Sequence, residues 1–83
     1  SDVVMEVNKS FFEKIIDELK EEKGVTFDNE LTTEDLQELV RRFKKVYSEN
    51  FADDWIFWFD LFDYLMNWSR KINLSSDLII LVF

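Results

Sequence analysis

The segment with the strongest structural signal begins at Leu31 and reads LTTEDLQELVRRFKKVY, which is typical of an amphipathic helix with a defined start. Thr32 can accept hydrogen bonds from the first free amides of the helix. Glu34 and Asp35 follow in the first turn, where the helix dipole favours negative charge. Leu31 and Leu36 are spaced as a hydrophobic staple around the cap. The sequence therefore predicts that a helix starts at Thr32.

The apolar residues of this helix recur every three or four positions, so they form one stripe that must be buried against neighbouring segments. We expect the helix to cover about residues 32–48. Its stripe consists of Leu36, Leu39, Val40, Phe43, Val46 and Tyr47. Four basic residues lie between these positions and are interpreted as the solvated face of the helix: Arg41, Arg42, Lys44 and Lys45.

An earlier segment predicts a first helix over about residues 9–23. Ser10 and Glu13 have the spacing of a capping box, and Gly24, the only glycine, can take the left-handed conformation that ends a helix. The residues before this helix could be the end of another helix or an extended lead-in. The expected apolar stripe is Phe11, Phe12, Ile15, Ile16 and Leu19.

The connection over residues 25–30 is short, which favours two antiparallel neighbouring helices. Phe27 lies in this connection and is expected to pack between the two helices, because its neighbours Asp28 and Asn29 are turn formers and Phe is not. We expect this pair to be the stable unit of the chain. Its interface is predicted to join Phe12, Ile15, Ile16 and Leu19 to Leu36, Leu39, Val40 and Phe43.

The composition changes after Asn50, because residues 51–83 hold all three Trp and most of the other aromatic residues. Residues 55–68 predict a third helix that is apolar almost all round, which a domain of 83 residues cannot bury alone. A protein partner or the rest of a larger domain is expected to cover it. Acidic residues interrupt the run, so a membrane span is not expected. LIILVF at 78–83 is predicted to be irregular or a short strand.

The predicted fold class is therefore all-α, with an antiparallel helix pair over residues 1–50 and a divergent part over 51–83. Four carboxylates of the second part could be read as a Mg²⁺ or Ca²⁺ site: Asp53, Asp54, Asp60 and Asp63. No loop geometry or phosphate partner supports that reading, so they are interpreted as a helix start and a solvated face. We expect no catalytic, cofactor-binding or metal-binding residue in this chain.

The composition also excludes several kinds of chemistry. The chain has no His and no Cys, which removes the commonest general base, the usual zinc ligand and any disulfide. A single glycine cannot make a glycine-rich phosphate loop. The net charge of −8 disfavours nucleic acid and anionic membranes as partners. No signal peptide is recognisable, and a cytoplasmic location is expected.

The first fifty or so residues resemble part of the N-terminal, nucleotide-binding region of pyruvate, phosphate dikinase. The matching stretches are SDVVMEV at 1–7, KS and FEKIID at 9–17, KEEKGV at 20–25 and FD at 27–28. They continue with LT, EDL and EL over 31–39, and with FK and VY over 43–47. The resemblance implies a small helical subdomain that acts as scaffolding near the ATP-binding cleft. The Mg²⁺, the ATP and the phosphorylated histidine of that family are held by segments that this chain does not match.

Two departures from the family pattern stand out. Asn8 occupies a position where the family often has proline, and after Asn50 the resemblance is lost. Residues 51–83 could be the product of a shifted reading frame or a real divergent tail. The resemblance favours a fragment of the dikinase without activity of its own. The composition leaves a second reading open, in which a small acidic interaction module docks on a partner through its aromatic helix.

Overall fold

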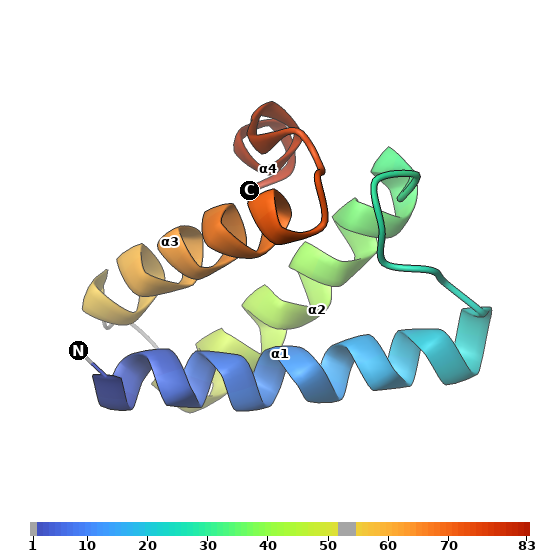
Figure 1. Cartoon of the computed structure of the whole chain (residues 1–83). Coiled ribbons are helices and arrows are strands. Elements are labelled where there is room, and N and C mark those ends of the chain that lie inside the picture. The colour runs from blue at the N-terminus through green and yellow to red at the C-terminus, as the bar shows by residue number, and fades with distance from the viewer. Residues whose placement is uncertain (1, 52–54) are drawn as a thin grey trace.

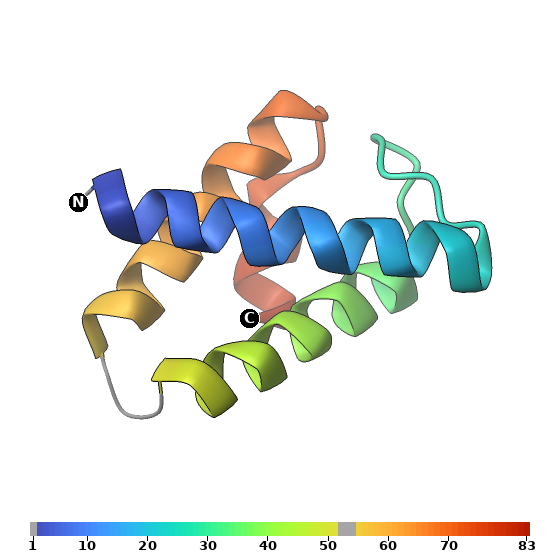
Figure 2. The same cartoon turned by 90° about the horizontal axis from the view of Figure 1, so that it is seen from below.

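The computed structural model describes residues 2–51 and 55–83, apart from the side chains of residues 2–5 and 51. Within these ranges the chain forms four helices and no strand. They are α1 (Asp2–Lys23), α2 (Thr33–Phe51), α3 (Trp55–Lys71) and α4 (Ser76–Val82). In Figures 1 and 2, α2 runs back in the direction opposite to α1, α3 crosses α1, and α4 lies against α2 and α3. The all-α prediction is confirmed.

The start of α1 differs from the prediction, because the helix begins at Asp2 rather than near residue 9. Ser10 is an exposed residue inside the helix, so the predicted capping box is wrong. The buried stripe explains the difference: Asn8 lies four positions before Phe12 and is completely buried, so the stripe extends one turn further toward the N-terminus. No glycine or proline interrupts this part of the chain.

The predicted C-terminal end of α1 at Gly24 and the predicted cap of α2 at Thr32 are confirmed. Gly24 has a φ of 64°, and its amide donates to the Lys20 carbonyl over 3.0 Å, which closes α1. The Asp35 amide donates to the Thr32 hydroxyl over 3.1 Å, so Thr32 caps α2. Leu31 and Leu36 are both buried, in agreement with the predicted staple.

The third helix is also confirmed, although it runs three residues further than predicted, to Lys71. It ends in a Schellman motif, in which the Leu74 amide donates to the Ser69 carbonyl over 2.8 Å and the Asn73 amide donates to the Arg70 carbonyl over 3.2 Å. Asn73 takes the left-handed conformation that this motif requires, with a φ of 58°. The motif buries Leu74 and turns the chain toward α4.

The C-terminal segment is helical, so the predicted irregular tail or short strand is wrong. The Ser75 side chain accepts a hydrogen bond from the Asp77 amide over 3.3 Å and caps α4. Ile79 is completely buried, whereas Ile80 and Leu81 are exposed. The cap and the burial of one helix face override the β propensity of LIILVF.

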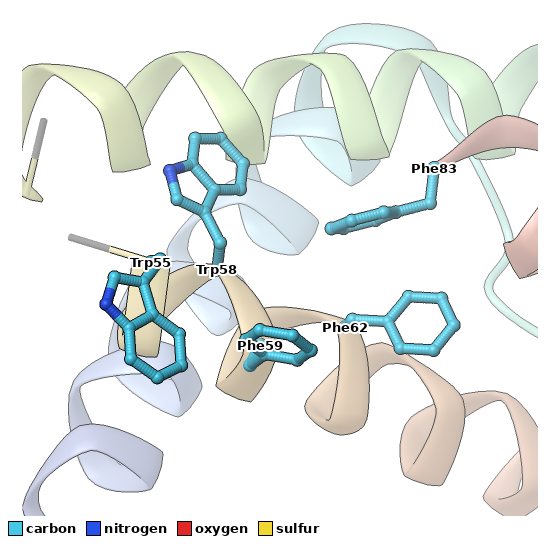
Figure 3. A pocket seen from close by; sticks show the side chains of 5 residues that line it. All are labelled: Trp55, Trp58, Phe59, Phe62 and Phe83. Atoms are coloured by element: carbon cyan, nitrogen blue, oxygen red, sulfur yellow. The ribbon is translucent and has the colours of Figure 1, made fainter. Parts of the chain in front are cut away.

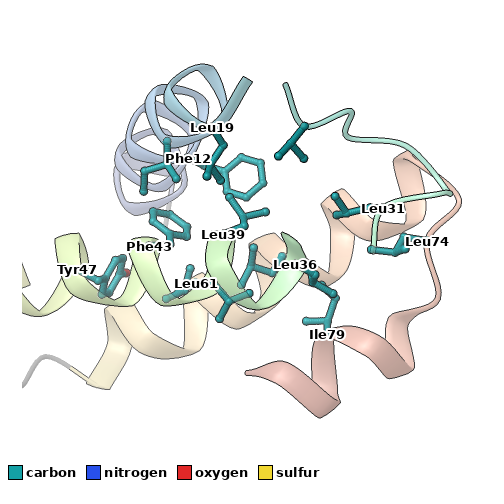
Figure 4. Close-up of a cluster of buried hydrophobic side chains, with 14 residues drawn as sticks. Phe12, Leu19, Leu31, Leu36, Leu39, Phe43, Tyr47, Leu61, Leu74 and Ile79 are labelled. Atoms are coloured by element: carbon teal, nitrogen blue, oxygen red, sulfur yellow. The ribbon is translucent and has the colours of Figure 1, made fainter. Parts of the chain in front are cut away.

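The buried apolar side chains of all four helices form one hydrophobic cluster (Figure 4). Phe12 is central to it, because its ring packs edge-on against Phe43, Tyr64 and Trp68 at centroid distances of 5.6, 5.1 and 5.0 Å. The cluster therefore joins residues before and after Asn50. It comprises Phe12, Ile15, Leu19, Val25, Leu31, Leu36, Leu39, Val40, Phe43, Tyr47, Leu61, Leu65, Leu74 and Ile79.

Two expected positions in the helix pair differ in detail. Ile16 is only partly buried, at the margin of the cluster. Phe27 is partly buried as well, and its ring lies 6.3 Å from that of Trp68, so it packs against α3 and not only against the first two helices. Part of the contact surface of Phe27 that the sequence predicts for the first two helices is therefore provided by α3.

Candidate functional site: an aromatic hollow at α3

Helix α3 buries one face and leaves large apolar side chains on another. Leu61, Leu65 and Ser69 are fully buried, and the two leucines belong to the hydrophobic cluster. Trp55 and Phe59 are 65% and 64% exposed, and the expectation that one small domain cannot cover this helix is met at its N-terminal half. Ile56 is also exposed, by 50%. Exposed aromatic side chains in one group are typical of binding surfaces.

Five aromatic side chains surround a hollow of about 270 Å³ (Figure 3): Trp55, Trp58, Phe59, Phe62 and Phe83. The four from α3 follow one another at helical spacing, and Phe83 follows the end of α4 and lies across the hollow from Trp55. Two pairs of these rings pack edge-on against each other. The ring centroids are 5.6 Å apart for Trp55 and Phe59 and 5.1 Å apart for Phe62 and Phe83. We call this site the aromatic hollow.

One charged group contacts the wall of the aromatic hollow. The Lys44 ammonium lies 4.6 Å from the centre of the Phe83 ring and donates a hydrogen bond to the Phe83 carbonyl. Lys44 is half-buried, so the interpretation of residues 41–45 as a wholly solvated basic face is wrong at this position. The contact between Lys44 and Phe83 therefore connects α2 to the residue that follows α4.

Tyr47 fixes the position of the first turn of α3 against α2. Its hydroxyl donates to the Phe57 carbonyl, and its ring lies 5.2 Å from that of Trp58 and 5.9 Å from that of Phe57. Tyr47 is completely buried. Trp58, which lines the aromatic hollow, therefore packs against Tyr47, a residue of the predicted apolar stripe of α2.

A separate charge network joins α1 to α2. Arg41 binds both oxygens of Glu38, over 3.0 and 2.7 Å, and Arg42 donates to Glu38 over 2.8 Å and to Glu22 over 2.7 Å. Hydrogen bonds from Arg41 and then Arg42 lower the pKa of Glu38 to about 2. The pKa of Glu22 is lowered by Arg42. Arg42 is half-buried in this network, a second correction to the solvated-face interpretation.

Only two of the four acidic residues of the possible metal site, Asp60 and Asp63 of α3, lie in the described part of the chain. Asp60 is partly buried and Asp63 is exposed, while Asp53 and Asp54 lie outside the described residues. Among residues 2–51 and 55–83, no three metal-ligating side chains of the His, Cys, Asp and Glu types share a site. In the same ranges, no helix is both long and apolar enough to cross a membrane.

Asn8 is a buried polar residue that the sequence alone did not single out as buried. Its side chain is completely buried in α1, and neither its amide nitrogen nor its amide oxygen has a hydrogen-bond partner among the described residues. Such a group loses its water without compensation, which destabilises the fold. Asn8 lies four positions before Phe12, a spacing that places it on the buried face of the helix. Because Asn is polar, a search for apolar residues at this spacing does not find it.

The comparison with curated proteins finds pyruvate, phosphate dikinases. The enzyme from Clostridium symbiosum is 69% identical over 49 residues, which is 59% of this chain and 6% of that protein. The chloroplastic enzymes of Mesembryanthemum crystallinum and Zea mays are 49% and 47% identical over 47 and 45 residues, or 57% and 54% of this chain and 5% of each protein.

This chain therefore spans only about one twentieth of the length of the curated relatives it matches. No family model matches the chain, and no solved structure matches it. The match of 49 residues is about as long as the N-terminal segment of some fifty residues whose sequence pattern resembles the dikinase. About three fifths of this chain is thus similar to one short segment of pyruvate, phosphate dikinase.

Proposed function

We propose that this chain carries a structural helical subdomain related to that of pyruvate, phosphate dikinase, and that it has no enzymatic activity alone. The observation that carries the proposal is the 69% identity over 49 residues with the Clostridium symbiosum enzyme. In the full enzyme we place this subdomain beside the ATP-binding cleft, as scaffolding. The burial of Leu36, Leu39 and Phe43 supports a packing role for this segment.

The dikinase reaction converts ATP, pyruvate and phosphate into phosphoenolpyruvate, AMP and diphosphate, with Mg²⁺. Phosphoryl transfer depends on groups that hold and neutralise the phosphates. This chain has no His and only one Gly, so it has neither a phosphohistidine nor a glycine-rich phosphate loop. We assign ATP, Mg²⁺ and the phosphorylated residue to other parts of the full enzyme.

An assay of phosphoenolpyruvate formation tests the lack of activity. The purified 83-residue chain, given ATP, pyruvate, phosphate and Mg²⁺, should form no more product than a buffer control. The Clostridium symbiosum dikinase serves as the positive control. Product above the buffer level that depends on this chain would contradict the proposal.

A chimaera tests the subdomain role itself. The matched segment of 49 residues in the Clostridium symbiosum enzyme is replaced by the corresponding segment of this chain. We expect the chimaera to stay folded and to keep most of its activity, because a scaffold needs only its packing. A matched chimaera with Leu36→Asp should lose folding, since Leu36 is completely buried. A folded but inactive first chimaera would overturn the scaffold role.

A second candidate function is docking of a protein partner on α3. The observation that favours it is the exposure of Trp55, Ile56 and Phe59 on one helix. Light scattering coupled to size exclusion tests the simplest case, in which a second copy is the partner. Wild type should then be larger than one chain, and the double substitution Trp55→Ser with Phe59→Ser should restore the mass of one chain. Two monomeric proteins would rule out self-docking.

The origin of residues 51–83 can be tested on the coding DNA. A shifted reading frame predicts that another frame after about codon 50 restores the dikinase pattern. A genuine divergent tail predicts that no frame does so. The burial of Leu61, Leu65 and Ile79 in the cluster of the helix pair supports the tail as part of this fold.

A further inference from the structure

We infer that a groove between α1 and α2 binds a partner helix, which is amphipathic and carries acidic and basic residues in opposite order on its two flanks. Two adjoining hollows of about 410 and 340 Å³ form this groove, and they share four lining residues: Ile15, Glu18, Val46 and Glu49. All the residues that line it come from α1 and α2, so α3 and α4 do not cover it. We call this site the interhelix groove. It shares no lining residue with the aromatic hollow.

The interhelix groove has the length and the floor that a helix of about three turns needs. On α1 it extends from Phe11 to Glu22, which is roughly 16 Å at 1.5 Å per residue. Its floor is apolar, because Ile15 is buried and Phe11 and Val46 are partly buried. The described part of the chain has no strand that could offer an edge to an extended peptide. A helix that lays its apolar face into the groove is therefore the binding mode that fits this fold.

Four charged side chains on the walls of the interhelix groove are free to pair with a partner. Lys14 and Glu18 lie one turn apart on α1, and Lys45 and Glu49 lie one turn apart on α2. None of the four forms an ion pair within the part of the chain that the structure describes. The arginines at the far end of the groove, in contrast, are already bound in the charge network between α1 and α2.

The order of these charges determines which partner fits. Because α1 and α2 are antiparallel, Lys14 and Glu49 line one end of the groove, and Lys45 lies toward the other end with Glu18 on the opposite wall. A matching helix needs an acidic and then a basic residue, one turn apart, on the flank at α1, and the reverse order on the flank at α2. Turning the partner end to end leaves this diagonal pattern unchanged. Only the exchange of acidic for basic residues destroys the match.

The floor and the walls contribute differently to binding. Lys14, Lys45 and Glu49 are exposed and Glu18 is half-buried, so each ion pair with a partner adds little by itself. The charges therefore select the partner, whereas burial of the apolar floor supplies most of the affinity. A second copy is a poor occupant, because two chains of net charge −8 repel each other. Binding in the groove does not depend on the dikinase reaction, so it can be tested on this chain by itself.

Titration of the ¹⁵N-labelled chain with two helical peptides tests this inference. Both peptides are based on Ala, which favours the helix, and carry the same apolar row at every third or fourth position. They differ only in the exchange of Glu and Lys on the flanks, so their composition and net charge are equal. We expect the matched peptide to bind about tenfold more tightly than the exchanged peptide, as four exposed ion pairs allow. It should shift the NMR signals of the α1 and α2 residues that line the groove.

Exchange of the charges on the chain provides the reciprocal test. The variant Lys14→Glu, Glu18→Lys, Lys45→Glu and Glu49→Lys keeps the net charge and should prefer the exchanged peptide by a similar factor. Lys45→Glu with Glu49→Lys alone alters only exposed side chains and should remove most of the preference. Circular dichroism checks that each variant is folded.

Two further variants separate the floor of the groove from other surfaces. Val46→Ala should weaken both peptides, because Val46 lines both hollows of the groove. Trp55→Ser with Phe59→Ser, at the aromatic hollow, should weaken neither. Equal binding of the two peptides, a preference that the charge exchange leaves unchanged, or no binding of either peptide would overturn the proposal. Shifts of the groove signals that depend on the concentration of the chain without peptide would identify a second copy as the occupant, and would overturn it as well.

Discussion

Lys44 and Phe83 lie 39 positions apart in the chain, yet the Lys44 ammonium sits 4.6 Å from the centre of the Phe83 ring and donates to its carbonyl. This pair connects α2, in the part that resembles the dikinase, to the segment after Asn50 that does not. It is therefore a direct contact between the two parts of the sequence.

Removal of the Lys44 charge should weaken the fold modestly. Lys44→Met keeps the apolar stem but loses the cation–π contact and the hydrogen bond, each of which contributes about 0.5–1.5 kcal/mol. We expect the free energy of unfolding to fall by about 1–3 kcal/mol in urea titrations. Lys45→Met is the matched control, because Lys45 is exposed, and it should change stability by less than about 0.5 kcal/mol. Equal effects of the two substitutions would contradict the role of this contact.

Leu39→Ala should destabilise the chain strongly. Leu39 is completely buried where the helices meet, so truncation removes apolar contacts and leaves a cavity. Such changes cost about 2–5 kcal/mol. Leu81→Ala is the control, since Leu81 is 73% exposed and should change stability little. Thermal unfolding measures both, and an unchanged midpoint for Leu39→Ala would show that this stripe is not buried.

Substitution of Asn8 by an apolar residue should stabilise the chain. The buried amide has no partner among the described residues, and its desolvation costs about 1–3 kcal/mol. We expect Asn8→Leu, or Asn8→Ala if Leu is too large for the space, to raise the unfolding midpoint. Exposed Asn67→Leu corrects for the general gain in helix propensity, which is a few tenths of a kcal/mol. A loss of stability in both Asn8 variants would show that the amide is satisfied.

The charge network predicts a pH dependence. The folded pKa of Glu38 is about 2, below its usual value of 4.5, so its stabilising contribution is present above pH 4.5 and is lost as the pH falls toward 2. The difference in melting temperature between wild type and Glu38→Gln should be constant above pH 4.5 and shrink below it. Exposed Glu21→Gln is the control. A difference that stays constant down to pH 2 would exclude this linkage.

Local signals in the sequence were sufficient to predict α2 and the ends of its neighbours. The cap at Thr32, the staple of Leu31 with Leu36 and the left-handed Gly24 each depend on a few adjacent residues, so a pattern can reveal them. The capping-box spacing at Ser10 predicts a later start for α1 than the structure has, because the buried stripe continues through the polar residue Asn8. The β propensity of LIILVF predicts an irregular tail or a short strand, but the packing of Ile79 favours a helix.

The aromatic hollow could be predicted only in part. The spacing of Trp55, Phe59 and Phe62 places these side chains on one face of a helix, and the sequence did indicate a surface that needs cover. The contribution of Phe83, and the contact of Lys44 with its ring, depend on the turn after α3 and on the direction of α4. No pattern in the sequence connects residues so far apart, and only the tertiary fold brings them together.

The segment after Asn50 completes the hydrophobic cluster of the helix pair. The sequence pattern predicts that the helix pair is the stable unit of the chain, but Phe12 packs against Tyr64 and Trp68, which the pair lacks. Thermal unfolding followed by circular dichroism, on the full chain and on residues 1–50, tests whether the helix pair needs this segment to fold. We predict one cooperative transition for the full chain and no cooperative transition for residues 1–50. An equally cooperative transition at the same temperature for residues 1–50 would contradict the claim.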